Sequence, residues 1–192
     1  MNKAVIWPNL LTFSRVLLVI PFIVYFPNPE LRGLWAVGLL ILCELTDAFD
    51  GMLARRIGAV SDFGKIFDPF SDSIYRLTAF LTLLLAGVFP WWAFLALLFR
   101  DVAVAYVRVF EATHGNVRAA RTSGKIKAIV QGGGLIILTI TAIYGGLWNW
   151  ELVNAVQWLT IIAVVGVTLW SLIDYAQPLF AAAKSHDEAN ED

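Results

Sequence analysis

Apolar residues in this chain fall into long, nearly continuous runs that short polar connections separate. Each run has about the 20 residues that an α-helix needs to cross the hydrocarbon core of a bilayer. Lipid offers no hydrogen bonds to a backbone, so such runs must form helices or a closed barrel, and their unbroken length favours helices. The pattern predicts an all-α integral membrane protein with six transmembrane helices, at residues 10–26, 34–54, 67–87, 91–110, 126–144 and 152–175.

Composition agrees with this class. Of the 192 residues, 59% are hydrophobic and 15% are charged, which is far more apolar than an average soluble domain. We expect one six-helix membrane domain over residues 1–183 and a polar, acidic, disordered tail at 184–192. The net charge of −1 gives no sign of a nucleic-acid partner, and none is expected. Cys43 lies in an apolar run, where packing is its simplest role.

Basic residues are distributed unevenly between the two sets of connections. The connections after the first, third and fifth runs contain only Arg32, whereas the termini and the other connections hold most of the remaining Lys and Arg residues. This bias predicts that both termini are cytoplasmic. The Trp pairs at 91/92 and 148/150 fall on the opposite side, as an interfacial belt would. Without a small-residue cleavage signature after the first run, we expect a bacterial inner membrane protein.

Four carboxylates interrupt the otherwise apolar pattern at the predicted cytoplasmic boundary. Asp47 and Asp50 are three residues apart, and Asp68 and Asp72 are four apart, so each pair shares one helix face. A carboxylate near hydrocarbon costs roughly 2.5–3.5 kcal/mol. A bound cation would offset that cost, and two carboxylate-bearing helices that face each other suit hard cations such as Mg²⁺ or Mn²⁺. Gly51 lies one turn after Asp47 and leaves room beside that row.

The spacing of these residues resembles a known family signature. Asp47-x2-Asp50-Gly51-x2-Ala54-Arg55-x8-Gly64-x3-Asp68-x3-Asp72 is similar to the complete motif of the CDP-alcohol phosphotransferases, which move a substituted phosphoryl group from a CDP-linked donor to an alcohol and release CMP. The resemblance implies six transmembrane helices, a homodimer, and two divalent ions held by the four aspartates, with Asp72 also the general base. It further implies that Gly51, Arg55 and Ser61 contact the CDP moiety. For Ser61, a simple helix N-cap is an equal alternative.

Flanking motifs resemble the phosphatidylglycerophosphate synthase branch of that family. They are Pro8-Asn9-Leu-Leu-Thr12-Phe-Ser-Arg15, Arg100-Asp101 followed by Arg108, and Ser123-Gly-Lys125-Ile-Lys127. We assign Asn9 and Thr12 to the donor. The resemblance implies CDP-diacylglycerol as donor and glycerol 3-phosphate as acceptor. Ser73 stands where that branch usually has Lys, and Asp101 where it usually has Glu, so inositol phosphate, serine or another alcohol remains the alternative acceptor.

Basic residues in the fourth run and before the fifth are candidates for binding a phosphate-bearing acceptor. They are Arg100, Arg108, Arg118, Lys125 and Lys127. A structural ion pair is the alternative for Arg100 and Asp101, and topology alone is the alternative for the cluster at 118–127. Near the acidic motif, Glu44 lies one turn deeper than Asp47, and Arg76 continues the Asp72 row, where it would neutralise the carboxylates. The glycines of residues 131–134 favour close helix packing.

A divalent-cation transporter is the competing class of function. A transporter would place acidic residues near the middle of the bilayer, along a path open to both sides. Here the four aspartates lie toward one side, and the opposite side carries no matching charges. The sequence therefore favours an enzyme with its active site facing the cytoplasm.

Overall fold

The computed structural model consists of helices joined by short connections. It describes the backbone of residues 3–57, 62–113 and 122–190, and the side chains of 14–46, 70–109 and 122–177. This part of the chain contains no β-strand. Its elements are α1 (Lys3–Tyr25), η1 (Pro29–Leu31), α2 (Leu34–Ile57), α3 (Asp62–Leu85), α4 (Trp91–Thr113), α5 (Thr122–Tyr144), η2 (Gly145–Leu147) and α6 (Trp150–Asn190).

Each of the six apolar runs corresponds to one α-helix, which confirms the all-helical class. Two segments with described side chains, Thr122–Leu147 and Trp150–Gln177, are long and apolar enough to cross a membrane. Six membrane spans remain a prediction. The structure differs from expectation in the tail, because α6 continues to Asn190 and gives residues 184–190 a helical backbone. The alanines at 181–183 favour such an extension, since alanine has the highest helix propensity.

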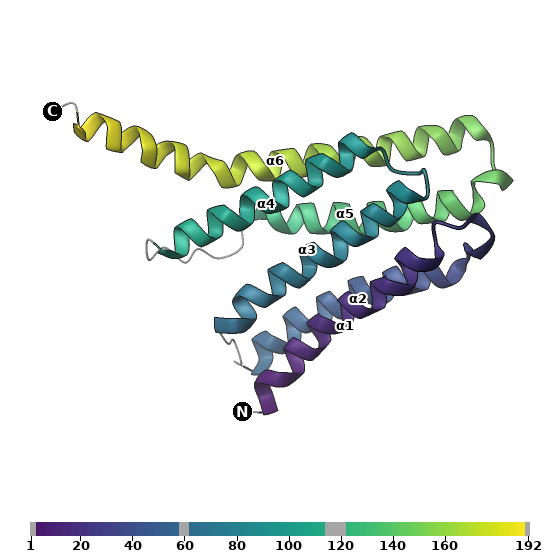
Figure 1. Ribbon diagram of the computed structural model, residues 1–192, viewed down its shortest axis with the longest axis horizontal. Coiled ribbons are helices and arrows are strands. Elements are labelled where there is room, and N and C mark those ends of the chain that lie inside the picture. The colour runs from purple at the N-terminus through teal and green to yellow at the C-terminus, as the bar shows by residue number, and fades with distance from the viewer. Residues whose placement is uncertain (1–2, 58–61, 114–121, 191–192) are drawn as a thin grey trace.

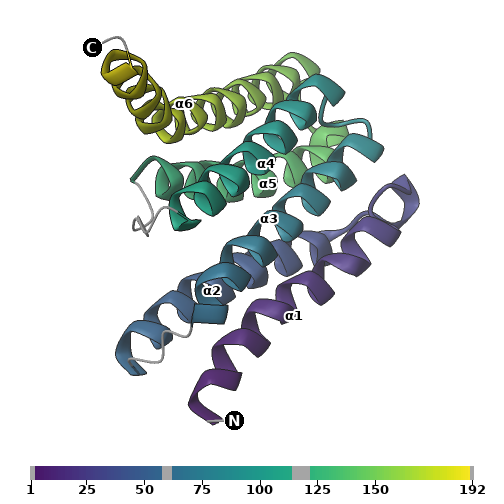
Figure 2. The same ribbon diagram turned by 60° about the vertical axis from the view of Figure 1, so that its left-hand side comes forward.

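The helices pack in two rows of three. α1, α3 and α4 form one row, and α2, α5 and α6 form the other; the rows meet where α1 contacts α2, α3 contacts α5, and α4 contacts α6. Figures 1 and 2 show α3 and α5 in the middle of the molecule. Both central helices carry residues of the predicted site, so side chains from either row can reach it.

Three connections lie together at one end of the molecule, shown on the right in Figure 1. The turn after α3 uses Gly87 at φ 76°, and its amide and that of Val88 bond to the last carbonyls of α3. Arg32 joins this turn to the α1–α2 connection. Its guanidinium donates to the carbonyls of Phe26 (3.0 Å), Pro27 (3.3 Å) and Ala86 (3.1 Å), so it satisfies groups at two helix ends.

Aromatic residues fill the core next to these connections. Phe22 and Phe26 lie with ring centroids 4.7 Å apart, and Phe80 and Phe89 with centroids 4.8 Å apart; all four are buried. By contrast, the part of α6 whose side chains are described leaves large apolar residues exposed, including Leu159, Ile162 and Ile173. Such a long apolar face is what a helix in contact with lipid would show.

Candidate active site

The acidic motif is divided between two helices that approach each other through their side chains. Asp47, Asp50, Gly51 and Arg55 lie in the second half of α2, and Asp68 and Asp72 lie in the first half of α3. Asp72 is the one member whose side chain the structure describes. The side chains of the other motif residues, and those of Asn9 and Thr12 in α1, lie outside the described residues, as do Ser61 and Arg118 altogether.

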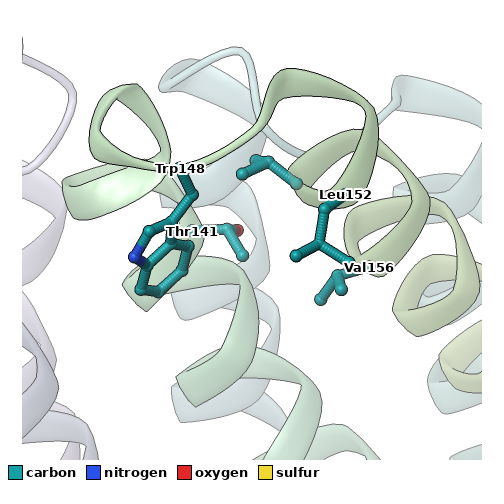
Figure 3. A pocket seen from close by; sticks show the side chains of 5 residues that line it. Thr141, Trp148, Leu152 and Val156 are labelled. Atoms are coloured by element: carbon teal, nitrogen blue, oxygen red, sulfur yellow. The ribbon is translucent and has the colours of Figure 1, made fainter.

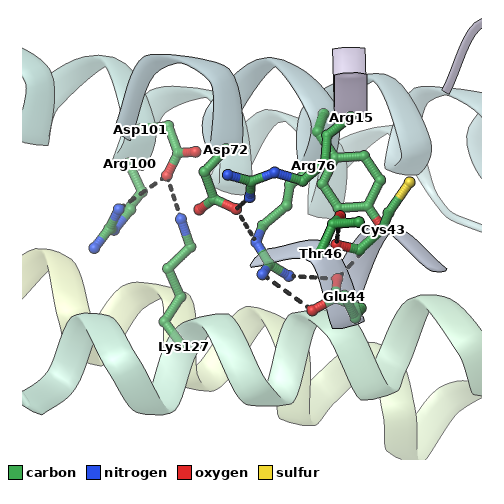
Figure 4. Close-up of polar contacts among 10 residues, drawn as sticks. Arg15, Cys43, Glu44, Thr46, Asp72, Arg76, Arg100, Asp101 and Lys127 are labelled. Atoms are coloured by element: carbon green, nitrogen blue, oxygen red, sulfur yellow. Dashed lines mark hydrogen bonds and ion pairs between the residues drawn. The ribbon is translucent and has the colours of Figure 1, made fainter. Parts of the chain in front are cut away.

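Asp72 belongs to a network of opposite charges that we call the Glu44–Arg76 network (Figure 4). Arg76 Nε donates to Asp72 Oδ1 at 3.0 Å, and its two terminal nitrogens donate to the two oxygens of Glu44 at 3.2 and 3.3 Å. Arg15 Nη1 of α1 approaches the same Asp72 oxygen at 3.7 Å. Both arginines are almost fully buried, at 2% exposure. Two buried cations therefore hold one oxygen of Asp72.

Glu44 connects this network to two further helices. Tyr75 of α3 donates its hydroxyl to Glu44 Oε1 at 3.3 Å. On the other side lies Gly132 of α5, where a Cβ atom would stand 2.5 Å from Glu44 Oε2. Because Glu44 precedes Asp47 by one turn of α2, and Arg76 follows Asp72 by one turn of α3, their contact brings the ends of the two carboxylate rows together.

A second buried network, the Asp101 network, lies beside the first. Asp101 Oδ1 accepts from Arg100 Nη1 at 3.0 Å and from Lys127 Nζ of α5 at 2.5 Å. Arg100 also donates to Ser171 Oγ of α6 at 2.7 Å. In Figure 4 the Asp72 carboxylate lies on the side of the Glu44–Arg76 network that faces Asp101 and Lys127, and its charge acts on Lys127. The two networks therefore lie next to each other inside the helix bundle and make up one charged region.

Tyr175 of α6 contacts two arginines of α4 at the edge of this charged region. The guanidinium carbons of Arg100 and Arg108 stand 5.5 and 5.6 Å from the centroid of its ring, and its hydroxyl lies 3.3 Å from Arg108 Nη2. Next to it, Ser123 Oγ donates to Asp174 Oδ2 at 2.5 Å. Gly124 leaves room for Tyr175, since a Cβ there would stand 3.2 Å from the phenol oxygen.

The structure thus brings together three of the five residues predicted to bind the acceptor: Arg100, Arg108 and Lys127. Lys125 is exposed and makes no polar contact with the described side chains. The alternative considered for Arg100 and Asp101, a structural ion pair between helices, also forms, since Asp101 of α4 pairs with Lys127 of α5 as well as with Arg100. Sequence reasoning overlooked the contribution of α6. The signal is present in the sequence, because Asp174 and Tyr175 follow Ser171 by three and four residues in an apolar run and so lie on its helix face.

A cavity of about 300 Å³ lies far from these charges, at the end of the molecule where α5, η2 and α6 meet (Figure 3). Its lining includes Thr141, Trp148, Leu152 and Val156. The described residues that line it are four apolar side chains and one hydroxyl, that of Thr141.

Two of the helices are long and apolar enough to cross a membrane, and the described side chains between the helices include two buried networks of charged residues, so the fold and the site define a helical protein of the membrane with a charged interior. Comparison with protein families gives the specific assignment. The family model for CDP-alcohol phosphatidyltransferases matches residues 5–177, and the chain belongs to that family. This confirms the resemblance seen in the aspartate motif and the expectation of a transferase.

Several relatives carry glycerol 3-phosphate in their names, and another is named for cardiolipin synthesis. CDP-diacylglycerol–glycerol-3-phosphate 3-phosphatidyltransferase of Treponema pallidum is 31% identical over 90% of this chain and 88% of its own length. The protein of the same name from Bacillus subtilis is 31% identical over 65% of this chain and 71% of its own length. A putative cardiolipin synthase of Mycobacterium tuberculosis is 33% identical, over 54% of this chain and 49% of its own length.

Proposed function

We propose that this enzyme transfers the phosphatidyl group of CDP-diacylglycerol to glycerol 3-phosphate and releases CMP. The family assignment supports the donor class, and the similarity to the Treponema pallidum protein over most of both chains supports the acceptor. One structural observation carries the proposal for the acceptor. Lys127 feels the charge of Asp72 and meets Arg100 at Asp101, and Arg100 shares the Tyr175 ring with Arg108. These three cations are of the kind that a phosphate monoester would need.

Divalent ions fit the residues present at the acidic motif. Arg76 and Arg15 hold Asp72 Oδ1, whereas Oδ2 has no partner among the described residues. Asp72 can therefore offer an oxygen to a hard cation, the ligand type that Mg²⁺ and Mn²⁺ prefer. In this proposal two ions are held by Asp47, Asp50, Asp68 and Asp72. When bound, they would neutralise the donor pyrophosphate and stabilise the charge that develops on CMP.

The chain's own residues would bind the donor, orient the acceptor and move one proton. Asn9, Thr12, Gly51, Arg55 and Ser61 would hold the CDP moiety. Asp72 would accept the proton of the acceptor hydroxyl, because an alcohol is a weak nucleophile until that proton leaves. The acceptor oxygen then bonds to the phosphorus of the phosphatidyl group as the bond to CMP breaks. Holding both substrates in line would supply much of the rate enhancement.

The charge balance of the Asp101 network supports an anionic acceptor. Arg100 and Lys127 share one oxygen of Asp101, so two buried cations face this single carboxylate, and Arg108 stacks on the Tyr175 ring that Arg100 also contacts. Arg100 Nε is buried and donates to no described group. An acceptor phosphate would supply the missing acceptor for that donor and the missing negative charge. A neutral alcohol would leave both unmet.

The proposed placement in the membrane follows the charge bias of the sequence. All six helices would span the bilayer, as one domain over residues 1–183, with both termini and the acidic motif on the cytoplasmic side of a bacterial inner membrane. The exposed apolar face of α6 and the Trp residues at the opposite end support this arrangement. A homodimer is the proposed assembly, on the family resemblance alone.

A lipid-linked alcohol is the second candidate acceptor. The similarity to the putative cardiolipin synthase favours it, and so does Ser73, which stands where a Lys is usual in the glycerol 3-phosphate branch. Inositol phosphate and serine are the remaining candidate acceptors, and the same experiment tests them.

CMP release by purified protein tests all of these acceptors. The protein would be given CDP-diacylglycerol, Mg²⁺ or Mn²⁺, and in turn glycerol 3-phosphate, phosphatidylglycerol, inositol phosphate and serine. We expect release with glycerol 3-phosphate; release with another alcohol alone would reassign the acceptor. Arg108→Gln should raise the acceptor KM, and Lys125→Ala tests whether that exposed lysine contributes. Uptake of Mn²⁺ into proteoliposomes with no CMP release would replace the enzyme hypothesis by transport.

A further inference from the structure

Arg76 makes more specific contacts than it would need only to neutralise the charge of Asp72. Its guanidinium bridges two helices, with one edge on Asp72 of α3 and both terminal nitrogens on the Glu44 carboxylate of α2. A bidentate contact fixes the plane of the guanidinium as well as its position. The orientation of Arg76 in turn fixes which oxygen of Asp72 is engaged and where the other oxygen points.

Glu44 is itself held from three sides. Arg76 and Tyr75 donate three hydrogen bonds to it from α3, and Gly132 of α5 borders its carboxylate. A Cβ atom at residue 132 would stand 2.5 Å from Oε2, 2.6 Å from Cδ and 2.9 Å from Oε1. Carbon cannot approach these atoms so closely, so a side chain at 132 would displace the carboxylate and the guanidinium bonded to it.

The neighbouring glycines show that this close approach is particular to Gly132. A Cβ at Gly133 would have no heavy atom within 4 Å, and one at Gly134 would meet Val164 of α6 instead. Gly132 is buried and Gly133 is exposed, although the two are adjacent in the same helix. Gly132→Ala therefore tests the contact, and Gly133→Ala is its matched control, because both replace a glycine by alanine inside the same helix.

From these contacts we propose that Arg76 and Glu44 are positioning residues for the reaction, and that Gly132 provides the space in which Glu44 holds Arg76. Arg76 keeps Oδ1 of Asp72 occupied, which directs Oδ2 toward the substrate. The inference rests on the proposed function, because Asp72 is the group that it positions.

Thermal unfolding tests the contact without any use of activity. Gly132→Ala and Gly133→Ala would each be made in the wild type and in a Glu44→Ala background. Gly132→Ala should lower the Tm of the wild type but have no such effect once Glu44 is truncated, because the carboxylate that it displaces is gone. Gly133→Ala should not lower the Tm in either background. If Gly132→Ala lowered the Tm equally in both backgrounds, the proposed contact between residue 132 and the Glu44 carboxylate would be wrong.

Kinetics of CMP release tests the consequence for the reaction. Gly132→Ala should lower kcat by about 10- to 100-fold, since small displacements of reacting groups have effects of this size. The KM for CDP-diacylglycerol should stay near its wild-type value, because donor contacts are intact. Arg76→Lys should show the same split, since it keeps the charge and loses the fixed plane. Gly133→Ala should match the wild type.

The outcomes separate this inference from the function on which it rests. A wild-type kcat in Gly132→Ala and Arg76→Lys would overturn the positioning role and leave the enzyme assignment intact. A rise in KM with unchanged kcat would also overturn it. Wild-type protein that releases no CMP with any acceptor would instead refute the proposed function, while the unfolding experiment still decides whether Gly132 and Glu44 share space.

Discussion

Replacing Asp101 by asparagine should be among the most destabilising single changes of a polar residue in this chain. The side chains of Asp101, Arg100 and Lys127 are only 5%, 7% and 7% exposed, and both cations bond to the same carboxylate oxygen. Asn keeps the shape and removes the charge, which leaves two buried cations without their counterion. Breaking a buried ion pair in this way costs about 3–5 kcal/mol. In a protein of this size that corresponds to a Tm decrease of roughly 6–20 °C.

Intrinsic fluorescence can follow the unfolding, since the chain has eight Trp residues. The protein would be heated in a mild detergent, with Glu151→Gln, an exposed carboxylate at the start of α6, as the matched control. Adding Lys127→Met to Asp101→Asn should restore much of the lost Tm, because the double variant no longer buries the unpaired ammonium. Inorganic phosphate should raise the Tm of Asp101→Asn more than that of the wild type.

The reasoning would be refuted by an Asp101→Asn protein that melts within about 2 °C of the wild type, a shift that corresponds to less than about 1 kcal/mol. A double variant that melts below Asp101→Asn would also contradict it. Either result would mean that the two cations find other partners when the carboxylate is removed.

Three other predictions concern the reaction and the fold. EDTA should stop CMP release and Mg²⁺ or Mn²⁺ should restore it; activity in the presence of the chelator would contradict the metal assignment. The Asp72→Asn protein should still bind the CDP donor but stay inactive with either ion. Tyr175→Leu should raise the acceptor KM about tenfold, because it removes the ring beneath Arg100 and Arg108, while Tyr175→Phe should have a smaller effect. Arg32→Ala should cost about 1–2 kcal/mol by losing its bonds to three carbonyls, seen as a lower Tm with unchanged CMP release at low temperature.

The hydrophobic pattern was sufficient to locate all six helices, because a long apolar run in a chain of this composition can satisfy its backbone only as a helix. Helical spacing also placed Asp72 and Arg76 on one face, and their ion pair confirms it. The spacing rule works here because both residues belong to the same helix. It could not indicate that Glu44, more than 30 residues away, is the other partner of Arg76.

Contacts between helices were the part that the sequence could not supply. Arg100 meets Ser171 across 71 residues, and Asp101 meets Lys127 across 26, so no local pattern relates them. The basic residues stand out in the sequence because charges are rare in apolar runs. Ser171 and Tyr175 do not stand out, because hydroxyl groups are common in such runs. The glycines at 132–134 predicted close packing, and the structure adds that Gly132 faces a carboxylate whereas Gly134 faces Val164.

The pairing of Arg100 with Asp101 has a consequence for how the protein is made. These residues are neighbours in α4, and their bond of 3.0 Å can form as soon as that helix exists, before Lys127 or α6 has been synthesised. A lone charge at the centre of an inserting helix costs roughly 2.5–3.5 kcal/mol. If α4 spans the bilayer as proposed, the adjacent pair lets the middle of the helix enter without a net charge. Asp101, which pairs with Lys127 in the folded protein, would thus first neutralise Arg100 while α4 inserts.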